Sequence, residues 1–478
     1  MKTARSRNGW VLALTSVASL MVALDTLVVS TALTTIRQDL GASIEELEWT
    51  VNAYNLSLAV LLMPAAALGD RFGRRRMFAA GLALFVATSA ACALAPGVGW
   101  LIAARAVQGA GAALVISLAL SIVSAAYPPE RRGTAIGILE GVTGLATIGG
   151  PVIGGAVSQG LSWEWIFWVN VPIGLVALPL ALTRIGESFG SDRALDIRGL
   201  VLVGAGAFGV VWALVRGNTA GWGSAEVLGA LVAGVALLAL FVAWELRTRE
   251  PMLPMRFFRS RAFTAGNAAT FFLFASLFGA VFFFAQFLQT SLGHDPLEAG
   301  LRLVPWTATL FVVAPIAGAL ADRIGERPLV VGGLALQAAG MAWLAVIAEP
   351  GLAFTEMLAP SIVTGVGASA AIPTSANAVV GAVTVDAVGK AAGANGMLRE
   401  LGGVFGIAVA VAVFAGTGSY ASAQAFSDGF APAMGVAAGL SLIGAFTGLV
   451  LPARRSTREE EMGNDDLSRG VAGIPNGA

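Results

Sequence analysis

Long apolar segments recur along the whole chain and are separated by short polar loops. A helix needs about 20 mostly apolar residues to cross the hydrocarbon core of a bilayer, where its backbone groups must be paired within the helix. The pattern therefore predicts an all-α membrane protein with fourteen transmembrane helices. The predicted spans are residues 10–31, 49–69, 77–95, 99–124, 133–158, 165–184, 197–216, 225–245, 262–288, 297–320, 328–348, 353–380, 396–417 and 431–451.

Composition supports this class of protein. The chain is 56% hydrophobic and 12% charged, whereas ordinary soluble domains carry about 25% charged residues. The formal net charge is zero, so charge gives no indication of nucleic-acid binding. The single cysteine, Cys92, excludes a disulfide framework, and the single histidine, His294, excludes a histidine-rich metal site. We therefore expect no metal and no cofactor, and we expect His294 to be a surface residue of an outer loop.

The placement of basic residues predicts the orientation. The first apolar stretch follows several basic residues, as in a signal peptide, but no small-residue cleavage site follows it, so we expect an uncleaved first helix. With fourteen alternating spans and a cytoplasmic N-terminus, all but four of the 29 Lys and Arg residues fall at the cytoplasmic side. The exceptions are Arg37, Arg105, Arg216 and Arg302. The sequence thus predicts a multi-pass inner-membrane protein with both termini in the cytoplasm.

A repeated loop predicts the domain organisation. Asp70-Arg71-x-Gly73 follows the second span, and Asp322-Arg323-x-Gly325 follows the tenth. Two six-helix halves would separate equivalent loops by six spans, so a separation of eight indicates an additional helix pair between them. Parallel six-helix repeats are a known transporter architecture, with the substrate site between the halves. The predicted parts are an N-terminal half (1–184), a linker with two extra helices (185–261), a C-terminal half (262–451) and a disordered tail (452–478).

Two ionisable residues lie at one depth inside the predicted spans. Asp25 and Arg105 are each about six residues from the outer ends of the first and fourth spans, or roughly 9 Å at a rise of about 1.5 Å per residue. They can meet if the helices are neighbours. A buried Asp prefers the neutral form, and a nearby Arg favours the anion. Asp25 could exchange a proton as its distance from Arg105 or from a cationic substrate changes; alternatively, the two form a static pair.

Glu140 is a second buried candidate. It lies about seven residues from the inner end of the fifth span, too far from Asp25 to pair with it. Helical spacing places it on one stripe with Gly144, Thr147 and Pro151. Ionisable groups in the hydrocarbon are costly and are candidates for function. We interpret Glu140 as a possible determinant of substrate selectivity; the alternative is a structural hydrogen bond to another helix.

Several motifs in order together resemble those of a known family. They are Leu24-Asp25-Thr26, Trp49 to Tyr54, Asp70 to Arg76, Arg105 with Gln108, Gly109 and Gly111, Gly149 to Gly155, and Trp165 to Pro172. Over essentially the whole chain, the sequence resembles the major facilitator superfamily, and within it the fourteen-helix drug:proton antiporters of the EmrB/QacA type. One departure is Ala66 in place of a glycine. The resemblance implies proton-coupled efflux of hydrophobic or cationic small molecules by alternating access.

The resemblance also implies roles for particular residues. Tyr54 and Gln108 join Asp25, Arg105 and Glu140 as candidates for proton coupling or substrate binding. The Asp-Arg-x-Gly loops would act as gates; alternatively, they are tight turns anchored by positive charge. The loop candidates are Asp70, Arg71, Gly73, Arg74, Asp322, Arg323 and Gly325. The resemblance implies that the fifth-helix glycines provide a bending point that limits leak during antiport. Alternatively, they only allow close packing of helices. The residues of this antiporter motif are Gly144, Gly150, Pro151, Gly154 and Gly155.

Other polar and aromatic residues have weaker interpretations. Eight phenylalanines crowd the ninth span, and we expect most of them to face lipid or pack. Some could line a drug cavity together with Gln286 and Gln289. Glu400 lies near an inner span end, where its side chain is expected to reach water.

Alternative functions are weighed against these patterns. A transporter of the same fold could export an endogenous metabolite or import a small solute, although import usually requires more polar residues in the spans. A membrane enzyme or sensor would need paired catalytic groups, which the spans lack. An ATP-driven pump needs a phosphate loop, and Gly389-Lys390-Ala391 lacks its hydroxyl residue. We therefore expect a non-enzymatic, monomeric transporter whose partners are drug-like small molecules, protons and the bilayer, not nucleic acid.

Overall fold

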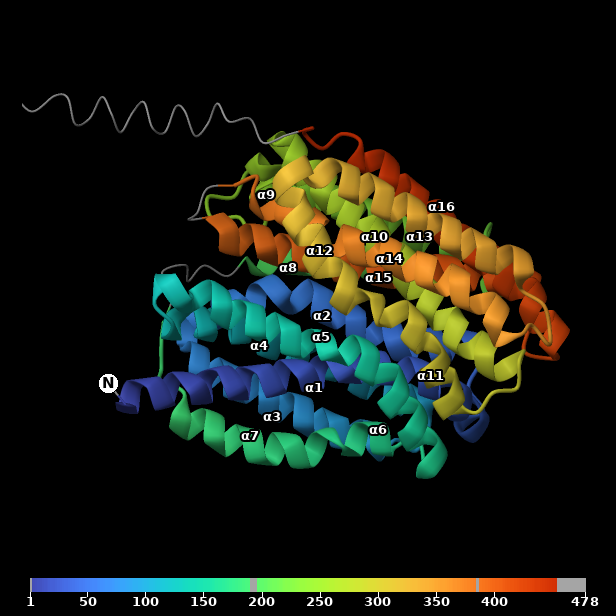
Figure 1. Ribbon diagram of the computed structural model, residues 1–478, viewed down its shortest axis with the longest axis horizontal. Coiled ribbons are helices and arrows are strands. Elements are labelled where there is room, and N and C mark those ends of the chain that lie inside the picture. Colours follow the sequence, from blue (N-terminus) through green and yellow to red (C-terminus); the bar gives the residue numbers. More distant parts are fainter. Residues whose placement is uncertain (1, 190–195, 384–386, 454–478) are drawn as a thin grey trace, which may run out of the picture.

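The computed structural model describes residues 2–189, 196–383 and 387–453, which form sixteen α-helices and one short 3-10 helix, and no strand occurs among them. The helices run largely side by side along the long axis of the molecule (Figure 1). The elements are α1 Lys2–Leu40, α2 Ile44–Phe72, α3 Arg74–Ala93, α4 Val98–Ala126, α5 Pro129–Gly160, α6 Trp165–Trp168, α7 Asn170–Arg184, α8 Ile197–Ala220, α9 Ala225–Glu245, η1 Met255–Arg259, α10 Arg261–Thr290, α11 Pro296–Thr307, α12 Thr309–Ile324, α13 Glu326–Ile347, α14 Phe354–Val380, α15 Val388–Thr417 and α16 Ala423–Gly448.

The helices account for the predicted spans. Thirteen segments of the described residues are long and apolar enough to cross a membrane. Two of them join a pair of helices, since α6 continues into α7 and α11 continues into α12. Helix α5 corresponds to the remaining predicted span and packs along α1 (Figure 1). The prediction of an all-helical, multi-pass membrane protein is confirmed.

Some boundaries differ from the predicted ones for local reasons. The last span was expected at residues 431–451, but α16 begins at Ala423. Its first turns are polar, with Gln424 bonded to Asp428 at 2.8 Å, so a purely apolar window does not include them. Ser422 caps this start by accepting a hydrogen bond from the amide of Ala425 at 3.1 Å. The tenth span is interrupted at Ala308 shortly after Pro305, which has no amide hydrogen to donate.

The helices form two groups. In the N-terminal group, α2 packs on α4, α1 on α5 and α3 on α4; in the C-terminal group, α13 packs on α14 and α10 packs on α15 and α16. Helices α8 and α9 pack on each other, and α8 also contacts α2 and α15. Most of α9 is exposed, as expected of a lipid-facing helix. The predicted division into two halves with an inserted pair stays a prediction, and α1–α7 and α10–α16 are called the N-terminal and C-terminal groups below.

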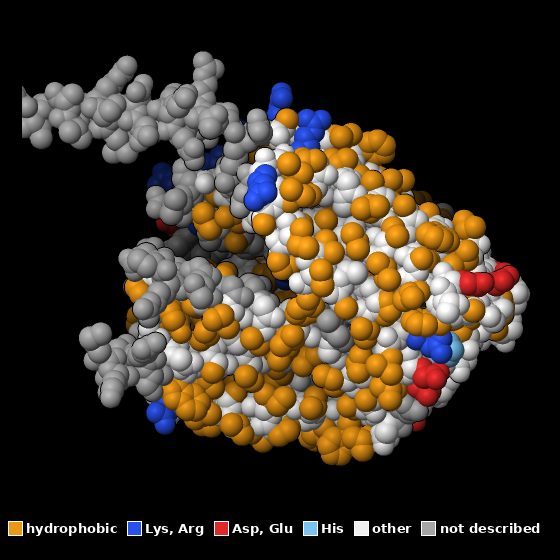
Figure 2. All heavy atoms as spheres, viewed as in Figure 1, with side chains coloured by type: hydrophobic (Ala, Val, Ile, Leu, Met, Phe, Trp, Pro, Cys, Tyr) orange, Lys and Arg blue, Asp and Glu red, His pale blue; other side chains and the backbone are white. Residues whose placement is uncertain are grey.

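The two groups touch mainly along two helix pairs, α2 with α15 and α5 with α11, and α1 also contacts α10 and α11. The contact of α5 with α11 lies at the far end of the bundle, defined as the end opposite to the start of α1. There Gly155 of α5 lies directly against the carbonyl of Pro296, and Gln289 donates to the carbonyl of Thr31 at 3.0 Å. At the end where α1 begins, Figure 2 shows a recess between the groups. The bundle is therefore closed at the far end.

Glycines allow close approach where α10 crosses α15. A Cβ atom on Gly406 would overlap the backbone of Ala275, and one on Gly279 would lie 2.8 Å from the carbonyl oxygen of Gly406. Small residues at such crossings let two backbones come close, which contributes to helix association in lipid. The C-terminal group therefore depends on the absence of a side chain at Gly406.

We predict that Gly406→Val weakens this crossing, because overpacking a close helix contact costs about 1–3 kcal/mol. The measurement is the thermal midpoint of the purified protein in detergent, which should fall. The control is Gly435→Val on α16, where a Cβ atom meets nothing within 4 Å. Equal midpoints for the two variants would contradict the close-packing role.

Candidate functional site: a buried ion pair beside an apolar cavity

Asp25 of α1 and Arg105 of α4 form a buried ion pair. The side chain of each is 1% exposed, and Nη1 of Arg105 donates directly to Oδ2 of Asp25. The same nitrogen donates to Oε1 of Gln108 at 2.8 Å, and Nε donates to the carbonyl of Thr50 at 3.2 Å. The contact follows from the equal depth of the two residues, as the sequence predicted. Three protein oxygens therefore accept hydrogen bonds from the guanidinium, and one of them belongs to the carboxylate that compensates its charge.

The second oxygen of Asp25 is held by two side-chain amides. Gln108 donates from Nε2 to Oδ1 at 3.1 Å, and Asn170, the first residue of α7, donates at 2.9 Å. Both amides also donate to Oγ of Ser89 on α3, at 3.3 and 3.0 Å. Ser89 in turn donates to the carbonyl of Phe167 at 3.0 Å. Four helices therefore supply hydrogen bonds to one buried carboxylate network, which sequence reasoning found only in part because Asn170 and Ser89 carried no charge signal.

Tyr54 connects the ion pair to the cavity. The guanidinium carbon of Arg105 lies 4.0 Å from the centre of the Tyr54 ring, a cation–π arrangement. The phenol oxygen lies 3.4 Å from the carbonyl oxygen of Val22 and 3.4 Å from Oγ1 of Thr26. Thr26 is the neighbour of Asp25 in sequence and lines the cavity described next. Because Thr26 and Asp25 are consecutive residues of α1, a movement of α1 at the cavity wall would also displace the Asp25 carboxylate from Arg105.

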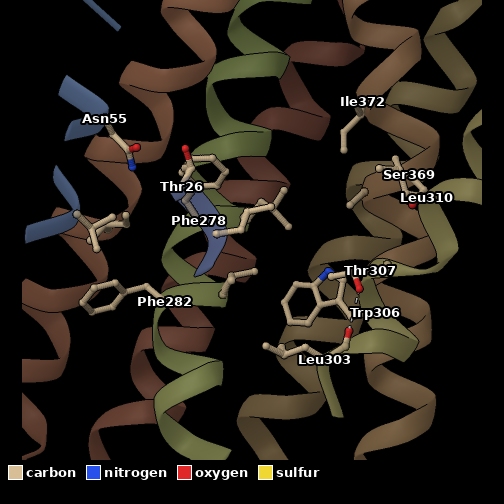
Figure 3. Close-up of a pocket in the computed structure, with 17 residues that line it drawn as sticks. Thr26, Asn55, Phe278, Phe282, Leu303, Trp306, Thr307, Leu310, Ser369 and Ile372 are labelled. Carbon is tan, nitrogen blue, oxygen red and sulfur yellow. Dashed lines mark hydrogen bonds between the residues drawn. The ribbon is translucent and has the colours of Figure 1, made fainter. Parts of the chain in front are cut away.

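An apolar cavity lies between the two helix groups. The cavity has a volume of about 100 Å³ and is partly open to solvent. The N-terminal group contributes Thr26, Leu27, Val51 and Asn55, and the C-terminal group contributes the rest, including three aromatic side chains (Figure 3). These aromatic residues are Phe278, Phe282 and Trp306. Among the described residues, no charged side chain lines the cavity, and Asp25 lies behind its wall. The mostly apolar lining suits an apolar ligand.

Some phenylalanines of α10 line the cavity and others pack inside the C-terminal group, whereas the glutamines of α10 do not line the cavity. Phe278 and Phe282 line the cavity, whereas Phe283 and Phe287 are buried in ring stacks with Phe414 and Phe430 at centroid distances of 4.6 and 4.2 Å. The suggestion that Gln286 and Gln289 line the cavity is wrong. Gln286 accepts a hydrogen bond from the Tyr420 hydroxyl and donates one to the carbonyl of Phe282. Gln289 donates hydrogen bonds to the carbonyls of Thr31 and Ala285.

The loop between α2 and α3 is held by a residue that sequence reasoning missed. Asp70 pairs with Arg74 at 2.8 Å within the loop itself. Glu187, which follows α7, lies 3.6 Å from Nε of both Arg75 and Arg76 and accepts from the Arg75 amide at 2.9 Å. A Cβ atom on Gly73, at φ 105°, would lie 2.8 Å from the Glu187 carboxylate. Only glycine fits this turn, because other residues avoid positive φ and need that space.

The second loop has the same turn in different surroundings. Gly325 also has positive φ, at 84°, and a Cβ atom there would lie 3.0 Å from the carbonyl oxygen of Ala453. Arg323 is exposed, and the side chain of Asp322 lies outside the described residues. In the first loop, Arg71 places its guanidinium carbon 5.2 Å from the Phe72 ring centre. The repeat is thus preserved as backbone geometry at Gly73 and Gly325.

The glycines of α5 make close contacts with two other helices. Cβ atoms on Gly150 and Gly154 would lie 2.6 Å from Leu27 and 2.8 Å from the carbonyl of Val28, and Gly155 abuts Pro296. Gly144 has no neighbour within 4 Å of such an atom. The side chains of Pro151 and Glu140 lie outside the described residues. Helix α5 runs unbroken, so the close contacts are observed, and a bending role for the motif stays a prediction.

Two further carboxylates have partners. Glu400 of α15 was expected to reach water, but it is 5% exposed and pairs with Arg399 at 2.9 Å; its helix packs against α2, which covers it. His294 lies 3.0 Å from Glu298. No group of three His, Cys, Asp or Glu residues in the described part of the chain could hold a metal ion.

Comparisons with known proteins agree with this architecture. The sequence matches the Major Facilitator Superfamily over residues 15–242 and 266–473. It is 36% identical over 397 residues to the tetracenomycin C resistance and export protein of Streptomyces glaucescens, covering 82% of this chain and 73% of that one. It is 33% identical over 467 residues to the cephamycin export protein CmcT of Amycolatopsis lactamdurans, covering 95% of each. The fold matches a crystal structure of the peptide transporter POT in complex with sulfate, with a TM-score of 0.68, 15% identity and coverage of 92% and 93%.

The chain therefore belongs to the Major Facilitator Superfamily, a family of transporters rather than enzymes. The resemblance read from the motifs is confirmed, down to relatives that are antibiotic export and resistance proteins. The membrane-spanning helices and the cavity between two helix groups are the features on which transport would depend.

We predict that Glu187→Gln loosens the loop between α2 and α3, because a neutral amide cannot compensate Arg75 and Arg76. Limited digestion with trypsin should cut after these arginines several-fold faster than in the wild-type protein, as quantified by mass spectrometry of the fragments. Glu250→Gln, at an exposed position of the segment between α9 and η1, is the control and should leave the rate unchanged. An unchanged rate in Glu187→Gln would show that the carboxylate does not hold the loop.

Proposed function

We propose that this protein exports drug-like small molecules in exchange for protons, by alternating access of the cavity to the two sides of the membrane. The observation that carries the proposal is a buried carboxylate, Asp25, whose neighbour Thr26 forms part of the cavity wall. The names of the relatives, which describe antibiotic export and resistance, support the direction and the class of cargo. The apolar lining disfavours import of a polar solute, which would need polar partners to replace its water.

Proton exchange would occur at the Asp25–Arg105 pair. A buried carboxylate remains charged only while its cation and hydrogen-bond donors stay in place. When α1 shifts relative to α4, Asp25 loses these partners and takes up a proton from the side to which it has opened. When the pair forms again, the carboxylate releases that proton to the other side. Because Thr26 and Tyr54 join the pair to the cavity, substrate and proton occupancy would oppose each other.

Opening toward the far end requires separating specific contacts. These are the packing of Gly155 on Pro296, the hydrogen bond from Gln289 to Thr31, and Arg37 over the Tyr420 ring, 4.0 Å from its centre. Burial raises the pKa of Tyr420, so its phenol stays neutral and presents an uncharged ring face to Arg37. Each contact joins the N-terminal group to the C-terminal group, so together they would form the gate on that side.

The orientation with cytoplasmic termini in the inner membrane is part of the proposal. Basic side chains gather toward the end where α1 begins, and acidic ones toward the far end (Figure 2). Positive loops face the cytoplasm. The recess between the helix groups would then open to the cytoplasm, where a molecule destined for export is collected. A monomer suffices, because cavity and ion pair belong to one chain.

The proposal is tested by transport in everted membrane vesicles with an imposed ΔpH. Drug-like compounds added to vesicles that contain the protein should dissipate the ΔpH, as reported by a pH-sensitive dye, and should accumulate inside. Vesicles without the protein are the control. If folded protein produced no response to any compound of a broad panel, drug:proton antiport would be excluded.

Asp25→Asn should uncouple the exchange, since an amide cannot carry the proton. We expect substrate-induced ΔpH dissipation to fall at least tenfold, while the protein still elutes from size exclusion as a single folded species. Asp428→Asn, on the exposed start of α16, is the matched control and should retain activity. Full proton-driven transport by folded Asp25→Asn would rule out the coupling role and leave a static pair.

A further inference from the structure

Asn55 of α2 is a buried amide with open hydrogen-bonding groups. It is 1% exposed, and Figure 3 shows it at the cavity wall contributed by the N-terminal group. Neither its oxygen Oδ1 nor its nitrogen Nδ2 has a hydrogen-bond partner. A buried polar atom left without a partner costs about 1–3 kcal/mol. Such a residue at a cavity wall is expected to be satisfied by what the cavity binds.

The hydroxyl side chains of the wall already have partners in the protein. Thr26 donates to the carbonyl of Val22 at 3.1 Å, and Thr307 donates to that of Leu303 at 3.3 Å. Ser369 shares a hydrogen bond of 3.0 Å with Thr309. Asn55 is thus distinguished among the lining residues, because it offers both a donor and an acceptor that the protein leaves unused.

The nearest acid on the same helix stripe does not reach the wall. Glu48 and Asn52 lie seven and three residues before Asn55, and Asn52 donates to Oε1 of Glu48 at 3.2 Å. Both are fully buried, and neither lines the cavity. The carboxylate is therefore separated from the cavity by Asn52 and Asn55, and the group presented to a ligand is a neutral amide.

Across the cavity from Asn55, the wall is apolar and aromatic. Trp306 lies on the opposite side, and Phe278 and Phe282 line the space between (Figure 3). Flat rings stack favourably on such side chains. A lipophilic cation, in contrast, would lose its hydration without meeting a compensating charge.

We propose that Asn55 selects neutral, flat aromatic substrates that carry a hydrogen-bond donor beside an acceptor, as in a carboxamide. The donor binds Oδ1, the acceptor binds Nδ2–H, and the ring system occupies the aromatic part of the cavity. This proposal rests on the proposed export function and narrows its cargo from hydrophobic or cationic molecules to neutral ones.

Three compounds with one ring system test the proposal. They are 9-anthracenecarboxamide, 9-methylanthracene and 9-(aminomethyl)anthracene, which is a cation at neutral pH. Binding to the full-length protein in lipid nanodiscs is measured as energy transfer from tryptophan to anthracene, with empty discs as background. We expect the carboxamide to bind about tenfold more tightly than the methyl compound, as two hydrogen bonds of about 0.7 kcal/mol each would give, and more tightly than the cation.

Variants of Asn55 test whether its amide causes the preference for the carboxamide over the methyl compound. Asn55→Leu should bring the ratio between the carboxamide and the methyl compound close to one, and unchanged binding of the methyl compound shows that the cavity is intact. If the leucine variant does not fold, Asn55→Ala replaces it and should also bring the ratio between the carboxamide and the methyl compound close to one. Asn55→Asp should strengthen binding of the cation about tenfold. Gln424→Leu, which removes an exposed amide at the start of α16, away from the cavity lining, is the control and should preserve the ratio.

The failures of the two proposals are distinguishable. If all three compounds bind and Asn55→Leu leaves the ratio unchanged, or if the cation binds the wild-type protein as tightly as the carboxamide, selection by Asn55 is refuted while the cavity keeps its role. If none of the compounds binds folded protein, both the selection and the cavity as a drug site are contradicted.

Discussion

The structure depends on one electrostatic constraint: a carboxylate and a guanidinium placed inside an apolar helix bundle must compensate each other. The constraint explains why α1, α2, α3, α4 and the α6–α7 segment converge where they do. Arg105 contacts Asp25, Gln108 and the carbonyl of Thr50, while Asn170 and Gln108 hold the other carboxylate oxygen. Losing one partner of a buried pair leaves an uncompensated charge, at a cost of about 3–5 kcal/mol. The N-terminal group is therefore built around a contact that is stable only in one arrangement.

Because of that constraint, the charged residues Asp25 and Arg105 lie apart from the cavity in which the substrate would bind. The ion pair lies behind the cavity wall, and the cavity itself is lined by uncharged residues. Substrate and proton would thus occupy adjacent but distinct places, joined through Thr26 and Tyr54. Such an arrangement lets the two sites influence each other through movement of α1 without direct contact between cargo and carboxylate. Coupling of this kind needs an element with two arrangements; in the proposed transport cycle the Asp25–Arg105 pair would be formed in one and separated in the other.

Much of the fold follows from the sequence, because helix length and apolar content are set by the bilayer. The depth of Asp25 and Arg105 along their helices also predicted their contact. Tyr54 and Gln108 were candidates through their motifs, whereas Ser89, Glu187 and Asn55 could not be predicted, since hydropathy does not specify which face of a helix meets which neighbour. Asn170 and Ser89 are uncharged, so nothing in the apolar pattern marked them. Glu187 lies in a connection. Asn55 becomes recognisable only once the helices are assembled, because it lines the cavity and neither polar atom of its amide has a partner.

The central claim is that Asp25 changes its protonation state during transport, and infrared difference spectroscopy tests it most directly. Substrate added to the protein in lipid should produce a difference band in the region of the C=O stretch of a protonated carboxyl group, reflecting a change in the protonation of the buried acid. The account predicts that this band disappears in Asp25→Asn and persists in Asp428→Asn. A spectrum without any such band in active wild-type protein, or the same band in Asp25→Asn, would contradict it.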